Sequence, residues 1–392
     1  MLLEREPRLK VLFLVEGFTD IRFVQGLSEI SRLTLVVPQR QFHESKLAER
    51  LVQSGAQLEV IEVPGNRLTF QARSFAHVLS RAGSVDVILA QEVLRGALNA
   101  NLAGLLRRVP VVMHMGIAPV EYFRCRRERH QLGPVAAAVG EGIIRALMTV
   151  NGRLSTRWLA LGDYLQGIAS TYSTRTEIGR YYGVDTDVFR PADEKEKQTL
   201  RQKLELPRDR FIIFFSSRVS HEKDPETALL ATARVRQQGL DAVLLNLGGG
   251  YEEFLALAKT MGLTGTDDWV LGRPPAHPVT EVMNYFRASD LLVQASLAEG
   301  LGLAPLEALA CGVPVVATAV GGMAVALKGY ADLTPRQDPD AMAEAILKVS
   351  REPLHAREQA LRGREYVIRE WSRKRAFEEL RGSLERAARS RP

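Results

Sequence analysis

The strongest structural signal in this chain is the segment Glu299-Gly-Leu-Gly-Leu-Ala-Pro-Leu-Glu307-Ala-Leu-Ala-Cys-Gly-Val-Pro-Val-Val-Ala-Thr-Ala-Val-Gly-Gly322. It follows an apolar run typical of a buried strand, opens with glycines and leads into a helix. Gly300 and Gly302 let backbone N–H groups come close to a ligand, and the positive end of the helix favours an anion there. The segment therefore predicts a strand, a loop and a helix that together hold a diphosphate.

The same segment carries two carboxylates, one at the loop entrance and one about two turns further on. Their places predict that Glu299 hydrogen-bonds a sugar and that Glu307 hydrogen-bonds a ribose. A glutamate that only complements the dipole at a helix N-terminus is the structural alternative for either residue taken alone.

Short apolar runs alternate with helix-length amphipathic stretches, which is the pattern of a parallel sheet with helices on both faces. The predicted strands of the first half are residues 10–15, 33–37, 58–63, 85–90, 109–115 and 157–161. Those of the second half are residues 211–216, 242–247, 269–272, 291–295 and 313–317. The pattern predicts an α/β protein made of two tandem, Rossmann-like, doubly wound domains.

The join between the domains is expected near Gly183-Val-Asp-Thr-Asp-Val-Phe-Arg-Pro191, because Gly and Pro punctuate it and a charged helix follows. We expect an N-terminal domain at 1–188, with a mostly helical insertion at about 119–156, and a C-terminal domain at 189–371. The basic helix 372–392 is expected to pack back toward the N-terminal domain. Ligands of such sheets collect at the carboxyl ends of the strands, so we expect the substrate in a cleft between facing domains.

The charge of the chain is uneven along its length. Lys and Arg number 52 against 46 Asp and Glu, a net charge of +6, and the segments 121–158 and 363–392 each contribute +4. Such segments attract anionic membranes, nucleic acid or anionic substrates, whereas solvated helix faces are the simpler interpretation. Aromatic residues are scattered and make up 7% of the chain, which argues against a nucleic-acid surface.

The cysteines and the N-terminal residues indicate the cellular compartment of the protein. Cys125 and Cys311 lack metal-ligand spacing and fit a reducing environment, and Pro7 follows acidic residues where a signal peptide needs an apolar run. The uncharged stretch 308–327 is interrupted by Gly and Pro, which favours a helix end and a buried strand over a transmembrane helix. We expect a cytoplasmic protein, with the inner face of the membrane as a second location.

The Glu-x7-Glu segment closely resembles the signature of the family-4 retaining glycosyltransferases (glycosyl transferases group 1), which have the GT-B fold. Further matches lie at the expected distances: Phe214-Phe-Ser-Ser-Arg218-Val-Ser-His-Glu-Lys223-Asp-Pro, Leu247-Gly-Gly-Gly-Tyr251 and the 183–191 segment. The resemblance is strong from 181 to 327 and holds in outline before that.

The resemblance implies that Arg218 and Lys223 hold the donor's diphosphate and act in catalysis together with Glu299. It extends the donor-binding set to the glycine-rich loops, namely Gly248, Gly300, Leu301, Gly302, Leu303 and Glu307. Family members need no divalent metal and no cofactor beyond the nucleotide sugar. Asp185-Thr-Asp187 spells a D-x-D motif, which holds a metal in the other large glycosyltransferase fold, but its context here is the linker of this family. We therefore expect no metal site.

The first half carries the acceptor side of the resemblance. His114 ends the buried run Val111-Val-Met-His-Met115, where the family often places a histidine beside the donor sugar and acceptor. We expect it to orient the acceptor or to stabilise the transition state through its ring or the neighbouring carbonyl; a structural histidine is the alternative. Gly17 lies in the first loop, where relatives commonly carry two glycines and this chain has Glu16-Gly17.

The resemblance implies a retaining transferase that moves a sugar from a UDP- or GDP-sugar to a glycan or lipid-linked acceptor, as in polysaccharide biosynthesis. The alternatives are a GT-B-fold epimerase or phosphorylase, or a non-enzymatic nucleotide-binding protein.

The helical insertion begins with a basic cluster, namely Arg124, Arg126, Arg127 and Arg129. An apolar helical face follows it, at Val139, Ile143, Leu147 and Val150. This insertion either docks on an anionic membrane or packs within the protein.

Overall fold

The structure is a computed structural model that describes residues 8–130, 133–276 and 278–390. By backbone contacts it divides into two compact units. The first unit contains the chain up to Val120, Gly133–Gly183 and the segment from Lys374 onward. The second contains the segment that begins at Glu121 and the stretch Val184–Arg373.

A seven-stranded sheet, parallel throughout, forms the centre of the first unit, in the order β3-β2-β1-β4-β5-β6-β7. Its strands are β1 (Lys10–Leu14), β2 (Arg32–Pro38), β3 (Leu58–Val63), β4 (Val87–Ala90), β5 (Val111–Met115), β6 (Arg157–Leu161) and β7 (Thr176–Gly179). Four of the five residues of β1 are buried, as a strand covered on both faces requires.

Helices connect these strands along the chain. They are α1 (Ile21–Ile30), α2 (Gln39–Glu44), α3 (Leu47–Ser54), α4 (Arg67–Ala82), α5 (Arg95–Arg107), α6 (Pro119–His130), α7 (Pro134–Leu154) and α8 (Gly162–Ser170). Asp20 begins α1 because its side chain accepts the backbone N–H of Arg22 at 2.9 Å. Asn66 begins α4 in the same way, accepting the N–H groups of Leu68 and Thr69.

The second unit repeats this arrangement around a six-stranded parallel sheet in the order β10-β9-β8-β11-β12-β13. Its strands are β8 (Phe211–Phe215), β9 (Ala242–Leu247), β10 (Val270–Arg273), β11 (Leu291–Gln294), β12 (Val315–Thr318) and β13 (Asp332–Thr334). The helices are α9 (Glu194–Lys203), the 3-10 turn η1 (His221–Lys223), α10 (Pro225–Gln237), α11 (Tyr251–Thr260), α12 (Thr266–Trp269), α13 (Val279–Ala288), α14 (Leu303–Ala310), α15 (Gly321–Ala326), α16 (Pro339–Arg351) and α17 (Pro353–Trp371).

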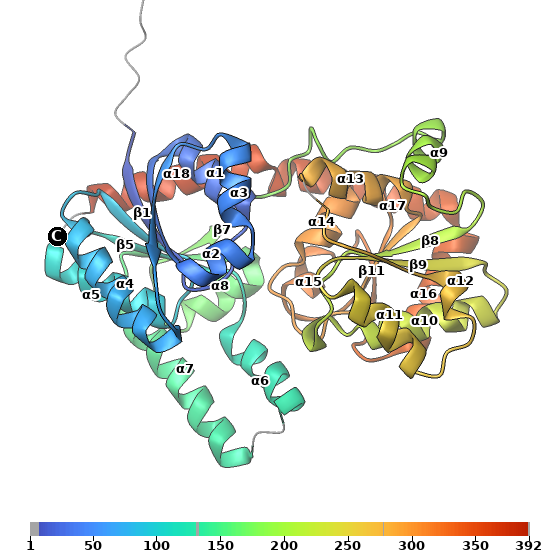
Figure 1. Ribbon diagram of the computed structural model, residues 1–392, viewed down its shortest axis with the longest axis horizontal. Helices are drawn as coiled ribbons and strands as arrows, with labels where there is room; N and C mark the ends of the chain where they lie inside the picture. The colour runs from blue at the N-terminus through green and yellow to red at the C-terminus, as the bar shows by residue number, and fades with distance from the viewer. Residues whose placement is uncertain (1–7, 131–132, 277, 391–392) are drawn as a thin grey trace, which may run out of the picture. The chain divides into compact units, whose positions relative to one another are not determined.

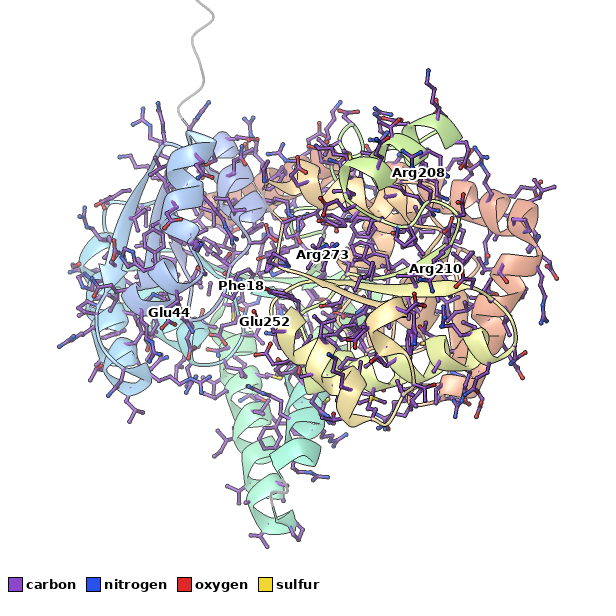
Figure 2. The ribbon with its side chains drawn as sticks, turned by 45° about the vertical axis from the view of Figure 1, so that its right-hand side comes forward. Phe18, Glu44, Arg208, Arg210, Glu252 and Arg273 are labelled. Carbon is purple, nitrogen blue, oxygen red and sulfur yellow. The ribbon has the colours of Figure 1, made fainter. Side chains whose placement is uncertain are left out.

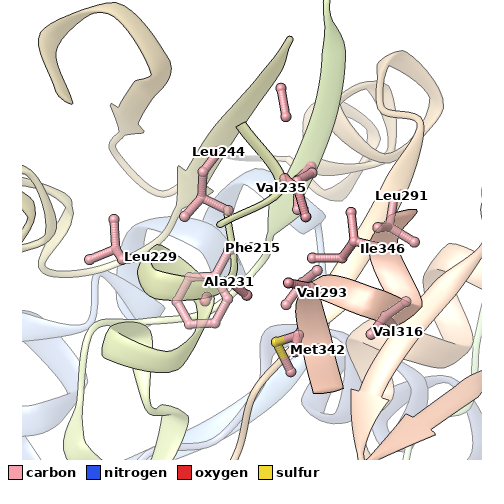
Figure 3. Packing of buried hydrophobic residues seen from close by; sticks show 14 of the residues in the cluster. Phe215, Leu229, Ala231, Val235, Leu244, Leu291, Val293, Val316, Met342 and Ile346 are labelled. Carbon is pink, nitrogen blue, oxygen red and sulfur yellow. The ribbon is translucent and has the colours of Figure 1, made fainter. Parts of the chain in front are cut away.

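Helices cover both faces of the second sheet. Figure 1 shows α13, α14 and α17 on one side of it and α10, α11 and α16 on the other. The core under α10 and α16 is wholly apolar: Leu291 and Val293 of β11 lie with Val235 of α10 and with Met342 and Ile346 of α16, all nearly inaccessible to solvent (Figure 3). This packing fixes the strand ends that carry the loops described below.

The last helix, α18 (Arg373–Arg389), belongs to the first unit from Lys374 onward. Phe377 stacks on Phe23 of α1 with ring centroids 6.2 Å apart, and Arg386 pairs with Glu177 of β7 at 2.8 Å. Arg180 and Glu379 form a further ion pair. The first and the last described segments therefore belong to the same unit.

The two doubly wound parallel sheets predicted from the sequence are confirmed. Two strands were missed: β7 is a half-exposed Thr-Glu-Ile-Gly, and β13 is three residues long. Both lie at sheet edges, where burial no longer imposes an apolar run. The start of the predicted strand 269–272 was wrong, because Trp269 ends α12 and β10 begins at Val270.

The predicted domain limits of 188/189 and 371/372 stay predictions, and the units change at Gly183/Val184 and Arg373/Lys374. The expected insertion at about 119–156 consists of two helices, and most of α6 clusters with the second unit whereas α7 clusters with the first. Among the helices of the described ranges, none combines the length and the hydropathy needed to cross a bilayer.

Candidate active site

In the second unit, the strand order reverses between β8 and β11, so the loops that follow these two strands diverge. Such a reversal leaves a crevice at the carboxyl ends of the strands, where open α/β sheets bind ligands. The loop after β8 carries Arg218 and Lys223, and the loop after β11 carries Glu299. The sequence therefore places three of its candidate residues at one crevice.

The loop after β8 has a fixed course. Asp224 adopts a left-handed conformation (φ 46°) and caps α10 by accepting the backbone N–H of Thr227 at 3.2 Å and its hydroxyl at 2.6 Å. Pro225 supplies the first helical residue. The backbone N–H of Leu297, after β11, donates to the carbonyl of Glu222 at 2.9 Å. The two loops of the crevice are thus bonded to each other.

Lys223 and Glu299 form an ion pair across this crevice. The ammonium Nζ lies 2.5 Å from Oε2 of Glu299, and both side chains are about four-fifths buried. The Ser296 hydroxyl donates to the same carboxylate oxygen at 3.4 Å, and the Gln294 amide in turn donates to Ser296 at 2.7 Å. The structure therefore brings together a cation and a carboxylate that the sequence placed 76 residues apart.

Arg218 has different partners. Its Nη2 donates to the hydroxyl of Tyr122 at 3.2 Å and forms an ion pair with Glu222, and the same tyrosine hydroxyl donates to Oε1 of Glu222 at 3.1 Å. The side chain of Arg218 remains 60% exposed. A cation that is anchored at one edge and open to solvent at the other is suited to binding an anion.

Glycines bring backbone close to backbone around the crevice. A Cβ on Gly322 would lie 1.8 Å from the carbonyl oxygen of Gly300, and a Cβ on Gly248 would lie 2.4 Å from that of Ser217. Gly302 is the N-cap residue just before α14 and has a φ of 84°, which disfavours any side chain. These positions accept glycine alone, because a side chain would separate the loops that line the crevice. Gly248 also donates its N–H to the carbonyl of Arg273 at 3.2 Å; Arg273, the last residue of β10, is labelled in Figure 2.

The remaining donor candidates lie on α14 and just before it. Leu301 is buried, and Leu303 is the first residue of α14. Glu307 is only 5% exposed, on the covered side of that helix. Glu307 is thus held inside the unit rather than in open solvent.

In the first unit, the strand order reverses between β1 and β4, and two carboxylates that the sequence analysis did not select lie at this point. Glu92 accepts the backbone N–H groups of Leu94 at 2.6 Å and Ala97 at 2.9 Å. Glu16 accepts the N–H of Gly96 at 3.1 Å and pairs with Arg95. Burial, followed by the nearby Glu16 charge, raises the pKa of Glu92 to about 7, although its backbone hydrogen bonds act in the opposite direction.

His114, near the end of β5, is 3% exposed. Its ring stacks on Tyr181 with centroids 5.0 Å apart, and Tyr181 also stacks on Phe23 at 4.4 Å. Burial lowers the pKa of His114 to about 4, so the ring is neutral at pH 7. Its Nε2 has no hydrogen-bond partner in the part of the chain that the structure describes.

The first loop is open at the predicted glycine. Nothing lies within 4 Å of a Cβ placed on Gly17, so the backbone there does not require a glycine. The neighbouring Phe18 is strongly exposed (Figure 2).

Asp185 of the D-x-D motif acts as a turn residue. Its Oδ1 accepts the backbone N–H groups of Asp187 and Val188, both at 3.3 Å. Across the described residues, no group of three or more His, Cys, Asp or Glu side chains has an arrangement that could hold a metal ion.

Tyr122, Glu222 and Glu92 were missed in the sequence. Glu222 adjoins Lys223, so its place in the motif was available as a signal. Tyr122 lacks a local signal, because its partner Arg218 lies 96 residues away. Glu92 accepts from the nearby Leu94 and Ala97, but the Glu16 charge that helps to raise its pKa comes from a distant loop.

The comparisons with known proteins identify the family of this chain. Residues 196–366 match the model of the family described as glycosyl transferases group 1. A D-inositol 3-phosphate glycosyltransferase 1 of Catenulispora acidiphila is 32% identical over 297 residues, which cover 73% of this chain and 68% of that protein. A D-inositol 3-phosphate glycosyltransferase of Frankia alni is 35% identical over 181 residues, 44% of each chain.

Two solved structures have the same fold. Anabaena Alr3699/HepE in complex with UDP-glucose superposes with a TM-score of 0.78 at 18% identity, covering 96% of this chain and 100% of that one. Sucrose-phosphate synthase of Thermosynechococcus elongatus gives a TM-score of 0.75 at 18% identity over 97% and 98% of the two chains. The fold is therefore that of the GT-B glycosyltransferases. The chain belongs to the glycosyl transferases group 1 family and is a glycosyltransferase.

Proposed function

We propose that this glycosyltransferase moves a sugar from a UDP- or GDP-sugar to a glycan or lipid-linked acceptor, with retention of the anomeric configuration and without a metal. One observation carries the proposal: the crevice between β8 and β11 has the cations Arg218 and Lys223 beside the glycine-rich backbone at 300–302. That combination matches a diphosphate, which needs both positive charge and close approach of backbone N–H groups.

The chemistry follows from the leaving group. As the bond between the sugar C1 and the diphosphate oxygen breaks, negative charge grows on that oxygen. A guanidinium and an ammonium held nearby stabilise this charge more in the transition state than in the ground state. The acceptor hydroxyl oxygen then bonds to C1 on the face that the diphosphate leaves, and its proton passes to the departing phosphate. No carboxylate nucleophile is required by this route.

The proposed role of Glu299 changes during the cycle. Glu299 pairs with Lys223 in the structure. When the diphosphate takes over the lysine, the carboxylate becomes available to accept hydrogen bonds from the sugar hydroxyls. Glu307 is proposed to bind the ribose, with Gly248, Leu301 and Leu303 lining the nucleotide.

His114 is proposed to act on the acceptor side through its backbone carbonyl. Its ring is covered by Tyr181 and stays neutral at pH 7, so the imidazole is a poor candidate for a charged contact. Gly17, in the open loop after β1, is proposed to leave room for the acceptor.

The relatives supply candidate substrates. The Anabaena protein is in complex with UDP-glucose, so UDP is the first nucleotide to test. The Catenulispora relative acts on D-inositol 3-phosphate, so a polyol is the first acceptor class to test.

Thermal unfolding with UDP, GDP and ADP tests the donor assignment. A nucleotide at about a hundred times its Kd adds about 2.7 kcal/mol to the stability of the state that binds it. Arg218→Ala and Lys223→Ala should abolish this stabilisation and cut turnover about a hundredfold or more. The control is Arg208→Ala, an exposed arginine before β8, at the opposite end of that strand (Figure 2). If the nucleotide still stabilises both Arg218→Ala and Lys223→Ala, these two residues do not bind the donor diphosphate.

Peripheral docking on an anionic membrane is proposed for the α6–α7 segment. Val135, Val139, Ile143 and Val150 of α7 are exposed. Arg124 and Arg126 of α6 are exposed too, while the side chain of Arg129 lies outside the described residues. Each basic residue near an anionic surface contributes about 1 kcal/mol, which salt screens.

Sedimentation with anionic and neutral liposomes, at low and high salt, tests this docking. Binding only to the anionic ones, lost at high salt and weakened in Ile143→Ser, is the expected result. If the protein binds anionic and neutral liposomes equally, or binds neither, the α6–α7 segment packs within the protein and does not dock on a membrane.

A further inference from the structure

Arg218 is fixed by a closed cluster of three side chains. Its Nη2 contacts both the hydroxyl of Tyr122, at 3.2 Å, and the carboxylate of Glu222, while that hydroxyl donates to Glu222 at 3.1 Å. Every member therefore contacts the other two. Within the described residues, both contacts of the guanidinium use the same nitrogen, so Nε and Nη1 stay available for a ligand.

Burial differs sharply within the cluster. The side chain of Glu222 is 9% exposed and that of Arg218 is 60% exposed. Burial alone would raise the pKa of Glu222, but its own backbone N–H and the charge of Arg218 outweigh this effect and lower the pKa. The carboxylate is therefore ionised at neutral pH. Its backbone carbonyl accepts Leu297, which ties the anchor to the loop after β11.

Tyr122 reaches this cluster from a distant part of the sequence. It lies on α6, whose residues from Glu121 onward cluster with the second unit. The guanidinium of Arg126, one turn further along α6, lies over the Tyr122 ring, 5.5 Å from its centroid. A cation over the ring face restrains the ring, and so restrains the hydroxyl.

We propose that Glu222 and Tyr122 are positioning residues that hold the guanidinium of Arg218 where the leaving diphosphate forms. The inference rests on the proposed function, in which Arg218 contacts that diphosphate. An arginine side chain has many rotamers, and an anchored one has already lost much of this freedom before the substrate binds. Without the anchor, each turnover has to order the side chain again.

The charge of Glu222 weakens the binding of an anionic ligand, whereas its contact with Arg218 strengthens that binding. Two substitutions separate these effects. Glu222→Gln and Glu222→Ala both remove a negative charge, which by itself favours an anionic ligand. Only Glu222→Gln keeps an oxygen that accepts from Arg218. The comparison of these two variants therefore measures the anchor alone.

The test measures the Kd for UDP and GDP by calorimetry and turnover by release of the nucleoside diphosphate. We expect Glu222→Ala to bind and turn over roughly tenfold to thirtyfold less well than Glu222→Gln. Tyr122→Phe, which changes no charge, should lose about threefold to tenfold relative to the wild-type protein. Tyr330→Phe, at a ring stacked on Tyr366 elsewhere in the second unit, is the matched control and should change neither value.

A double-mutant cycle separates positioning from general stability. In an Arg218→Ala background, Glu222→Ala and Glu222→Gln should become indistinguishable, because the residue to be positioned is gone. A purely structural role would keep their difference in both backgrounds. Circular dichroism of each variant checks that it is folded at the assay temperature.

The outcomes distinguish this inference from the proposed function. If the wild-type protein binds no nucleoside diphosphate, or if Arg218→Ala binds as well as wild type, the proposed function is overturned and the inference with it. If Arg218→Ala fails to bind while the Ala and Gln variants at Glu222 behave alike, only the inference is overturned.

Discussion

Glu92 should make the first unit less stable as the pH rises through neutrality. Its pKa is about 7 in the folded protein against an ordinary value of 4.5. Because the folded-state value is the higher one, the folded protein binds the proton more tightly than the unfolded chain does. The free energy of unfolding therefore falls as the pH rises from 4.5 to 7, and the loss is complete above 7.

The size of the effect follows from the two pKa values. Their separation corresponds to at most about 3 kcal/mol, with the partial exposure of Glu92 acting to reduce it. Glu92→Gln cannot titrate, so its free energy of unfolding should rise relative to wild type between pH 4.5 and pH 7.5 by up to that amount. The glutamine amide accepts the N–H groups of Leu94 and Ala97 less well than the carboxylate does. This loss lowers the stability of the variant by an amount that does not vary with pH.

Urea unfolding at several pH values measures this difference. Trp158 is fully buried in β6 of the first unit, and its fluorescence reports on that unit when Trp269 and Trp371 are replaced by Phe in all samples. Glu49→Gln, on the exposed side of α3, shows how much pH dependence comes from net charge alone. A free energy of unfolding of Glu92→Gln that stays constant or falls relative to that of wild type as the pH rises would refute the reasoning.

Three further predictions concern the second unit. Gly322→Ala places a methyl group 1.8 Å from the carbonyl oxygen of Gly300, so nucleotide affinity should fall more than tenfold, with about 1–3 kcal/mol lost from the free energy of unfolding; unchanged calorimetric titrations would contradict this. Glu307→Gln should chiefly raise the Kd for the nucleotide, whereas Glu299→Gln should chiefly lower turnover; the reverse pattern would exchange their proposed roles. Activity should persist in EDTA, and a loss that Mn²⁺ or Mg²⁺ restores would return Asp185 to consideration as a metal ligand.

The parts of the fold that could be predicted from the sequence are those where local pattern and burial agree. β8 and β11 are short apolar runs because they lie inside a sheet covered on both faces, so their periodicity predicts them. The tight turn at Gly302 could also be predicted, because its φ of 84° admits few residues other than glycine. Edge strand β7 carries polar residues and gave no such signal.

In the candidate site, too, some residues could be predicted from local motifs and others could not. Lys223 and Glu299 could be selected because each lies in a recognisable motif, although only the structure shows them in contact. Tyr122 could not, because its contact with Arg218 forms only in the folded chain. Glu92 could not, because the charge of Glu16 beside it comes from a different loop. The burial of His114 near a strand end could be predicted, but Tyr181, whose ring covers it, holds a φ of 51° that no pattern predicts.

The return of α18 to the first unit has a consequence for how the chain responds to cutting. The two stretches where the chain passes between units are bonded to each other, since Val184 donates its N–H to Trp371 at 2.7 Å and accepts that of Arg373 at 2.8 Å. A protease that nicks the chain near Pro191 leaves both fragments with parts of the first unit, joined there by the contacts of Phe377 and Arg386. The nicked protein should therefore stay in one piece through gel filtration, and the two fragments, expressed separately, are candidates for a split enzyme that reassembles by complementation.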